Sequence, residues 1–509
     1  MPQTSEKLIF KNSLLLSLRS FLVMLVGLYT SRVLLAKLGI EDYGTYNIVG
    51  SVVVLFGSVR AMFTNAIQRY LNYTKNGGEY NQVQVFNASL LLQLILAGAF
   101  LILTETLGIY ALHNLNLTPE QHRDAQIIYQ IAVATALVSI ITVPYDALII
   151  AHEKMDIFAW LSVLSSLLNL GIVYLLSLGP FSRLVNYAIL VFLASCIIRG
   201  ITAAYCHRRF KESRIQKTYS KPLLKEMTAF AGWNFLGYAG YSIMHQGVNY
   251  LLNLAGGVVV NAARAIAYTI TSKANELVLN ANTAFKPQTN AAAAEQDPSN
   301  FHKLLGYNAK ASYSVFLLIM VPVLIFAQPF IQLWLGQVPE YVIVFLLAIS
   351  PYYLLRTLHE LVNQFFVSIG QMKWYSIIEL ATMILILPLS WALLKGGRPF
   401  WTVFLCMFVL EAVNHAGSVW LGARKYSFPF KRYAKDVYLP FLLVSSLSAL
   451  LVIAAYRFGL AQLELWGRII LCGLGIECIL ATAMAFIVLS KQERHAILGH
   501  ISLWIKREK

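Results

Sequence analysis

The sequence predicts an all-α integral membrane protein with about 14 transmembrane helices. Of its 509 residues, 58% are hydrophobic and only 13% are charged, whereas ordinary soluble domains carry about 25% charged residues. Apolar stretches of about 20 residues, the length that crosses a bilayer, recur from near the N-terminus almost to the last residues. The segments between them are too short for a soluble domain.

The apolar stretches define the expected helices in chain order. They cover 9–36, 44–67, 86–112, 124–148, 156–178, 184–206, 228–254, 260–285, 308–328, 341–368, 373–394, 399–422, 436–457 and 467–490. The first stretch is not followed by a cleavage site of small residues, so we expect this helix to be retained. Several of these helices contain an internal proline, which removes a backbone donor and kinks a helix. These prolines include Pro144, Pro322, Pro351 and Pro388.

The basic residues orient these helices in the membrane. The chain has 40 Lys and Arg against 24 Asp and Glu, for a formal charge of +16. When the N-terminus is placed in the cytoplasm, most of the basic residues fall in cytoplasmic segments, as the positive-inside rule requires. The sequence therefore predicts that both termini are cytoplasmic. Membrane topology explains the net positive charge. The basic segments could also contact anionic lipid, and nucleic acid is not expected as a partner.

A basic cytoplasmic linker, residues 208–227, divides the chain into two comparable lobes. Six helices precede it in 1–207, and six follow it in 228–423. An even number of helices in each lobe predicts a parallel pseudo-two-fold repeat. A shift of 217 residues superposes Gly39 on Gly256 and the first helix pair on the seventh and eighth helices. Two appended helices in 424–490 have no counterpart, and a basic cytoplasmic tail, 491–509, follows.

Polar residues recur along one face of two predicted helices. In 228–254 they are Asn234, Tyr238, Tyr241, His245 and Asn249. In 260–285 they are Thr269, Lys273, Glu276, Asn280 and Thr283. Spacings of three and four place such residues on one side of a helix. These two helices are therefore expected to present polar faces.

Permanent charges inside predicted spans indicate a binding site. Arg19 and Arg60 have no acid at helical spacing in their own helices. Because a charge in hydrocarbon costs at least a few kcal/mol, we expect both arginines, with Lys273, to face an aqueous cavity and bind an anion. Lys273 and Glu276 are three residues apart, so mutual neutralisation is an alternative for that pair.

Titratable groups in the spans are candidates for ion coupling. Glu276, His245 and Glu360 are the ones we single out, although a histidine such as His245 is more often hydrogen-bonded within the bundle. Arg356 is a further candidate for substrate binding, but Glu360 lies four residues away and can neutralise it. Arg199 lies near a span end, where snorkelling is expected. The sequence does not rank the remaining acids in spans, which are Glu105, Asp146, Glu379, Glu411 and Glu477.

Little in the sequence suggests an enzyme. The predicted external segments are short and sparsely charged, which leaves no place for a domain carrying catalytic carboxylates. There is no G-x-x-x-x-G-K-[ST] motif for a built-in ATPase. The five cysteines show no CxxC or metal-ligand spacing, so no metal or other cofactor is expected.

Four segments resemble polysaccharide-export flippases of the Wzx type. They are RVLLAKLGIEDYGTYNIVGSV (32–52), AIQRYLNY (66–73), AHEKMDIF (151–158) and GQMKWYSIIE (370–379). These O-antigen and polysaccharide flippases belong to the multidrug/oligosaccharidyl-lipid/polysaccharide (MOP) exporter superfamily. The MurJ-type lipid II flippases and the MATE drug exporters are members of the same superfamily.

The resemblance implies a mechanism and a cargo. It implies two six-helix lobes around a central cavity, with the first, second, seventh and eighth helices at the portal and alternating access by rocking of the lobes. The cargo would be an undecaprenyl-diphosphate-linked glycan, with its diphosphate held by Arg19, Arg60 and Lys273. In this interpretation Asn234, Tyr238 and Tyr241 contact the sugar.

The resemblance also implies a setting and leaves alternatives. The setting is the bacterial inner membrane, where a polysaccharide polymerase or other export components for lipopolysaccharide would be partners. A MATE-like drug exporter is one alternative, but the excess of basic over acidic residues on the portal helices argues against a carrier of cationic drugs. A membrane-bound glycan-transferring enzyme is the other alternative.

Overall fold

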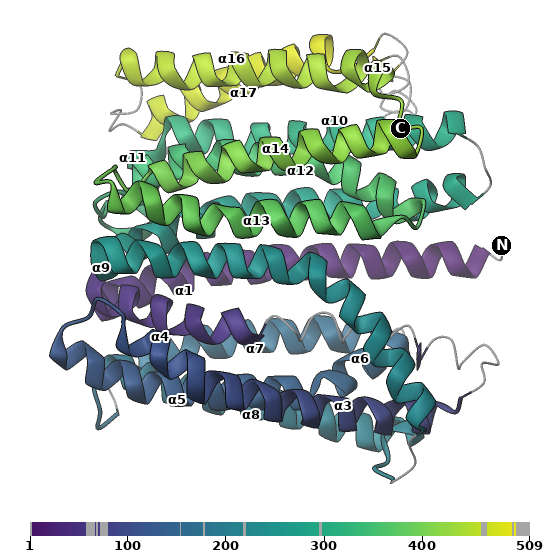
Figure 1. The fold of residues 1–509 in the computed structure, drawn as a ribbon. Helices are drawn as coiled ribbons and strands as arrows, with labels where there is room; N and C mark the ends of the chain where they lie inside the picture. The colour runs from purple at the N-terminus through teal and green to yellow at the C-terminus, as the bar shows by residue number, and fades with distance from the viewer. Residues whose placement is uncertain are drawn as a thin grey trace, which may run out of the picture. The chain divides into compact units, whose positions relative to one another are not determined.

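The structure, a computed structural model, is built from helices (Figure 1). It describes residues 3–57, 67, 70–71, 80–152, 154–176, 179–216, 220–294, 298–459, 466–490 and 493–494. Side chains within 3–21 and 229–239 lie outside this description. No strand occurs in the described ranges, which confirms the all-α class.

The helices follow one another with short connections. Up to the basic linker they are α1 (Gln3–Gly57), α3 (Gln82–Leu103), the π-helix η1 (Thr104–Gly108), α4 (Ile109–His113), α5 (Pro119–Ile141), α6 (Val143–Ala151), α7 (Met155–Leu175), α8 (Arg183–Arg209) and the 3₁₀ turn η3 (Lys211–Ser213). After it come α9 (Lys221–Ala294), α10 (Pro298–Ile325), α11 (Ala327–Leu335), α12 (Val342–Ser368), α13 (Met372–Lys395), α14 (Thr402–Lys425), α15 (Phe430–Tyr433), the π-helix η4 (Ala434–Tyr438), α16 (Leu439–Arg457) and α17 (Trp466–Ile487).

The helices account for the expected membrane spans. In the described part of the chain, 11 segments are long and apolar enough to cross a membrane. Two of them, in α1 and α9, each contain two helices joined at a kink. When the two halves of α1 and of α9 are counted separately and the shorter apolar helix Leu471–Ile487 is added, the number of spans agrees with the predicted figure of about 14.

Both kinks fall on a glycine with positive φ. Gly39 has φ 82° and ψ 174°, and Gly257 has φ 71° and ψ −166°. Glycine adopts such conformations at little cost because it has no Cβ. The two turns therefore correct the predicted repeat by one residue, since Gly39 corresponds to Gly257 and not to Gly256.

The chain divides into two compact units. Unit 1 contains Met1–Ala265, Trp334–Glu340 and Glu379–Phe400, and unit 2 contains Ile266–Leu333, Tyr341–Ile378 and Trp401–Lys509. Each of α9 and α13 contributes to both units. The division into lobes at the basic linker 208–227 stays a prediction.

Each unit has its own apolar core. In unit 1, α1, α3, α5, α7 and α8 contribute Val49, Phe100, Tyr129, Val173 and Val185 to one cluster of buried side chains. In unit 2, α10, α12, α14, α16 and α17 contribute Leu317, Phe365, Val419, Val444 and Leu480. The appended helices α16 and α17 therefore form part of the core of unit 2.

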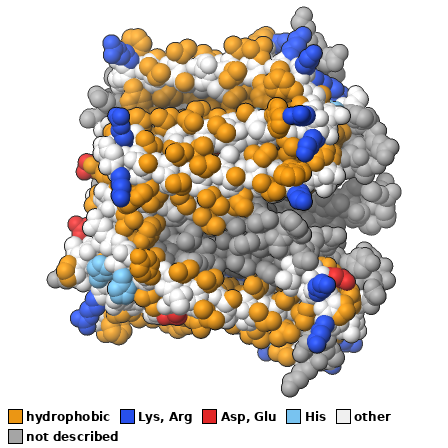
Figure 2. Space-filling view, viewed as in Figure 1, with side chains coloured by type: hydrophobic (Ala, Val, Ile, Leu, Met, Phe, Trp, Pro, Cys, Tyr) orange, Lys and Arg blue, Asp and Glu red, His pale blue; other side chains and the backbone are white. Residues whose placement is uncertain are grey.

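The outer surface is apolar along the helices. On α14, Leu405, Val409 and Val413 recur every fourth residue and are about half exposed. Figure 2 shows such side chains along the helices of both units, while Lys and Arg gather at the helix ends. Exposed apolar surface of this extent is typical of a face that contacts lipid.

Candidate functional site

Part of the predicted cationic site falls outside the described residues. This holds for Arg60 and for the side chains of Arg19, Asn234 and Tyr238. The anion site that the sequence assigns to Arg19 and Arg60 therefore stays a prediction. The structure does describe Lys273, Glu276, Tyr241, His245, Arg356 and Glu360.

Lys273 and Glu276 form an ion pair on α9. Lys273 Nζ lies 2.7 Å from Glu276 Oε2, and the two side chains are 31% and 43% exposed. The two charges therefore neutralise each other, which is the alternative that the sequence left open for this pair. The role of Lys273 in anion binding stays a prediction.

A second polar group lies in unit 1, where the two halves of α9 meet. Arg264 is buried, and its Nη2 donates to the backbone oxygen of His245 at 2.7 Å. The His245 ring contacts the Tyr241 ring, with their centroids 4.3 Å apart. His245 and Tyr241 therefore lie together, as their spacing predicted, and Arg264 adds a charge beside them.

Three asparagines extend this group toward α1. Asn249 Nδ2 donates to Asn47 Oδ1 at 3.0 Å, and Asn261 Nδ2 donates to Asn249 Oδ1 and to its backbone oxygen, both at 2.8 Å. Sequence reasoning missed Asn47, Asn261 and Arg264. Asn261 and Arg264 lie three residues apart in the predicted span 260–285, so the spacing that selected Lys273 and Glu276 would have found them.

In unit 2, Arg356 binds a carboxylate on another helix. Its Nη1 donates to Glu411 Oε1 at 3.2 Å, and the Glu411 side chain is almost fully buried. Glu360, the expected partner, accepts from Asn363 Nδ2 at 3.0 Å. Glu411 thus compensates the charge of Arg356 from α14, and the role of Arg356 in substrate binding stays a prediction.

Two buried histidines lie beside this ion pair. The Nδ1 atoms of His359 and His415 are 3.3 Å apart. His359 Nε2 lies 2.8 Å from Tyr375 Oη, and His415 Nε2 lies 3.0 Å from Tyr438 Oη. Sequence reasoning missed both histidines, although Glu411, His415 and Ser418 lie on one face of α14 at helical spacing.

A third ion pair explains Arg199. Its Nη1 lies 2.6 Å from Asp146 Oδ2, with the two side chains 17% and 15% exposed. Snorkelling predicts an exposed guanidinium, so the prediction for Arg199 is wrong. Asp146 on α6 holds the arginine of α8 inside unit 1, because a paired charge costs less in a low-dielectric interior than a single one.

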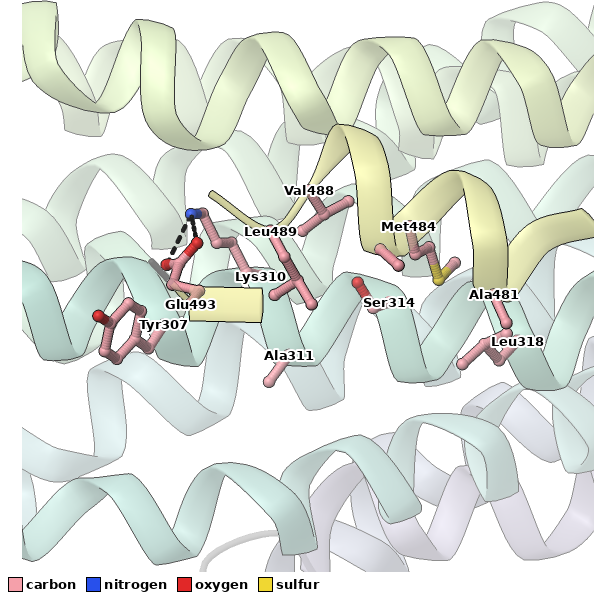
Figure 3. A pocket seen from close by; sticks show the side chains of 11 residues that line it. Tyr307, Lys310, Ala311, Ser314, Leu318, Ala481, Met484, Val488, Leu489 and Glu493 are labelled. Carbon is pink, nitrogen blue, oxygen red and sulfur yellow. Dashed lines mark hydrogen bonds and ion pairs between the residues drawn. The ribbon is translucent and has the colours of Figure 1, made fainter. Parts of the chain in front are cut away.

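An apolar cavity of about 490 Å³ lies in unit 2 between α10 and the end of α17. Leu318, Met484 and Val488 are among its lining residues. Lys310 Nζ binds both carboxylate oxygens of Glu493 at 3.0 Å and closes one end (Figure 3). The cavity offers room for an apolar chain and no free charge.

The described residues show no cluster suited to a metal ion. No group of three or more His, Cys, Asp or Glu side chains among them is arranged to hold one.

Comparisons with known proteins agree with this architecture. The family model described as "Polysaccharide biosynthesis protein" matches residues 9–293. No curated protein matches the chain in sequence. Among solved structures, an inward-facing MATE family transporter of the MOP superfamily superposes with a TM-score of 0.68 at 17% identity, covering 80% of this chain and 94% of that one.

Two further structures show the same fold. An outward-facing MATE family transporter of the MOP superfamily has a TM-score of 0.59 at 18% identity and covers 82% of this chain and 96% of its own. A MOP superfamily transporter from Pyrococcus furiosus, whose description reports a binding pocket of reverse polarity, has a TM-score of 0.59 at 18% identity, with 80% and 94% covered.

Fold and family together define the class, a multi-pass membrane protein with the fold seen in transporters of the MOP superfamily. The chain belongs to the polysaccharide biosynthesis protein family, because the family model covers more than half of it.

Proposed function

We propose that the protein is a flippase, which moves a polyprenyl-diphosphate-linked oligosaccharide from the cytoplasmic to the external leaflet of the bacterial inner membrane by alternating access. The observation that carries the proposal is the family match over residues 9–293. The matched family is described by polysaccharide biosynthesis, and the matched range includes Arg19, Arg60 and Lys273.

The proposed chemistry follows from the cargo. Its diphosphate cannot cross hydrocarbon unaided, and arginine binds phosphate oxygens through two parallel hydrogen bonds. We assign this role to Arg19 and Arg60. The prenyl tail stays in lipid while the sugar, in contact with Asn234, Tyr238 and Tyr241, moves through a wet route.

The ion pair on α9 supports a wet route. Lys273 is 16 residues past the turn at Gly257, or about 24 Å along the helix at 1.5 Å per residue. This depth falls within a hydrocarbon layer of about 30 Å. Partly exposed charges at such a depth face water or protein, since contact with lipid tails is costly.

The same pair is weak enough to exchange partners. Ion pairs three or four residues apart on a partly exposed helix stabilise by only about 0.2–0.5 kcal/mol. A diphosphate carries more charge than one carboxylate and can replace Glu276 at Lys273. On this reasoning Glu276 holds Lys273 in place until cargo arrives.

Transport by the purified protein tests the proposal. Proteoliposomes would receive a fluorescent polyprenyl-diphosphate oligosaccharide, and the wild type would be compared with Arg60→Ala and Arg60→Lys at equal protein content. We expect Arg60→Ala to reduce the flipping rate by about 10-fold or more, because a charge-assisted hydrogen bond contributes about 1.5–3 kcal/mol. Arg60→Lys keeps the charge and should restore part of the rate.

The matched control is Arg432→Ala. Arg432 is about half exposed and lies 3.9 Å from Asp436 on the same helical segment, so its loss should leave flipping unchanged. Normal transport by both Arg60 variants would remove Arg60 from the mechanism. Absence of any flipping by the wild type would overturn the flippase proposal itself.

The fold likeness to multidrug transporters supports a second candidate, a drug exporter. Ethidium efflux from the same proteoliposomes distinguishes the two functions. A chain that moves ethidium and not the lipid-linked glycan is a drug exporter. Glycan transfer by the purified protein would instead revive the enzyme alternative.

A further inference from the structure

The buried histidine pair of unit 2 is a polar site that has no part in the proposed binding of the diphosphate and the sugar. His359 is 1% exposed and His415 is 8% exposed, and both lie within segments apolar enough to span a membrane. Ionisable residues in such segments are costly and usually functional. The pair joins α12 to α14, and its tyrosine partners come from α13 and η4.

The hydrogen bonds of the pair allow only certain protonation states. Two Nδ1 atoms 3.3 Å apart can bond only if one of them carries a proton and the other offers a lone pair. With both rings neutral, the chain of bonds runs from one tyrosine to the other: one hydroxyl donates to its histidine, and the second histidine donates to the other hydroxyl. In this arrangement each of the four side chains takes part in a hydrogen bond, and every ring nitrogen has a partner.

One added proton fits this arrangement and a second does not. A single proton makes one ring cationic, keeps the Nδ1–H···Nδ1 bond, and requires both tyrosine oxygens to accept. A second proton would place two N–H groups against each other, with two like charges in contact. The pair therefore has room for one proton.

Two charged groups of opposite effect lie beside the pair, because the Glu411 carboxylate favours a cationic ring and the Arg356 guanidinium opposes it. Glu411 Oε1 lies 3.9 Å from His359 Nδ1 and 3.2 Å from Arg356 Nη1. Because Glu411 also binds Arg356, only part of its negative charge is available to the histidine ring. On α10, which packs against α12, Lys310 binds Glu493 and does not face the pair.

A fully buried amide lies next to these groups. Asn414 precedes His415 on α14, and neither its Oδ1 nor its Nδ2 has a hydrogen-bond partner among the described residues. It shares a helix face with Glu411 and Ser418. The last residue of the π-helix η4 is Tyr438, and π-turns of this kind frequently accompany functional sites.

We propose that the facing Nδ1 atoms of His359 and His415 form a binding site for one proton per chain. When the proton binds, the hydroxyl oxygens of Tyr375 and Tyr438 must both accept hydrogen bonds. The protonation state of the pair is thereby linked to the start of α13 and to the appended helix α16. We assign the bound proton to the coupling step of the transport cycle. This assignment deepens the proposed function and rests on the protein being a flippase.

Proton binding is tested without any transport substrate. The full chain, labelled with ¹⁵N-histidine and reconstituted in lipid, would be titrated from pH 8 to pH 4 by solid-state NMR, with His359→Gln and His415→Gln used to assign the rings. We expect both rings to shift in one transition that accounts for one proton. Two rings that stay neutral throughout, or that each take a proton of their own, would overturn the proposal.

Two milder variants and a control keep this titration decisive. Tyr438→Phe and Tyr375→Phe remove a single hydroxyl that must accept from the cation, so each should move the transition to lower pH. His302→Gln is the control, because His302 lies 3.2 Å from Tyr433 Oη in the same unit without a second histidine. It should leave the shared transition unchanged. An unchanged transition in both tyrosine variants would contradict the assigned bonds.

Coupling is tested in proteoliposomes with the membrane potential clamped. A pH gradient should change the flipping rate of the fluorescent lipid-linked oligosaccharide by about fivefold or more in the wild type, within the usual range of allosteric coupling. In the double variant His359→Gln, His415→Gln the ratio should fall to about one while flipping without a gradient persists. A gradient response kept by the variant excludes the pair from coupling. A wild type that flips no lipid refutes the flippase proposal and leaves the NMR result to decide the proton site.

Discussion

At the scale of single residues, close backbone contacts explain particular glycines of unit 1. A Cβ added at Gly44 would lie 2.2 Å from the carbonyl oxygen of Val258. Val258 directly follows the turn at Gly257, so the glycine of one hairpin accommodates the backbone of the other. A Cβ added at Gly50, further along α1, would meet nothing within 4 Å, so Gly50 has no such role.

Gly44→Ala should destabilise the protein, whereas Gly50→Ala should not. Overpacking against a backbone atom costs about 1–3 kcal/mol, while alanine in an open helical position gains up to about 1 kcal/mol over glycine. Thermal unfolding of the two variants in detergent checks this. Equal midpoints for both would contradict the close contact between the hairpins.

The pair of Asp146 and Arg199 predicts non-additive mutations. Asp146→Asn leaves a mostly buried guanidinium without its carboxylate and should cost about 3 kcal/mol, the lower end for buried pairs because both side chains keep some exposure. Adding Arg199→Gln should recover part of that loss. A double-mutant cycle in thermal unfolding measures the coupling, and additive effects would show that the pair contributes nothing.

At the scale of elements, α17 is attached to unit 2 by apolar packing and by one ion pair at its end. Leu480 and Met484 are buried in the core of the unit, and Glu493 beyond the helix binds Lys310 of α10. Burial by itself raises the pKa of Glu493, but hydrogen bonds from the Ser490 backbone and from Lys310 outweigh it, so the pKa is lowered from 4.5. The ionised carboxylate of Glu493 thus fastens the segment that follows α17 to α10.

Acid should loosen this attachment. Because the pKa of Glu493 is lower in the folded chain than the ordinary value of 4.5, its stabilisation is complete above that value and is lost as the pH falls through the folded pKa. Limited proteolysis near 490–494 should therefore accelerate at acid pH. In Glu493→Gln, cleavage should be fast already at neutral pH and respond little to acid, and an unchanged cleavage rate in that variant would exclude the ion pair.

At the scale of the whole molecule, the positions of the basic residues follow the expected membrane topology. Apolar side chains cover the helices, and the basic residues gather at the helix ends (Figure 2). The positive-inside rule predicts that both termini are cytoplasmic. The connection 114–118 between α4 and α5 would then be external.

Reporter fusions test this orientation. A fluorescent protein fused after Lys509 should fluoresce, and an alkaline phosphatase fused there should be inactive, because each reporter works on one side of the membrane only. The same reporters placed after Leu115 should give the opposite pattern. Matching results at both positions would show that the predicted number of crossings between them is wrong.

Much of the fold and some of the polar faces could be predicted from the sequence. Hydropathy located the helices because a span in lipid must be apolar for about 20 residues, and helical spacing placed Tyr241 beside His245. Helical spacing alone does not predict the His359–His415 contact, because the two rings lie on different helices. Arg264 contacts a backbone oxygen, which has no signature in the sequence. Arg356 was paired with Glu360 because only local partners are visible along a helix.

The sequence by itself determined the class: an all-α membrane protein with about 14 spans, a positive-inside charge pattern and a resemblance to polysaccharide exporters. Only the tertiary structure decided which charges meet. Arg356 and Glu411 are 55 residues apart, and His359 and His415 are 56 apart. The physical reason is that helical periodicity shows which side chains share a face, whereas the face opposite is set by the packing of whole helices.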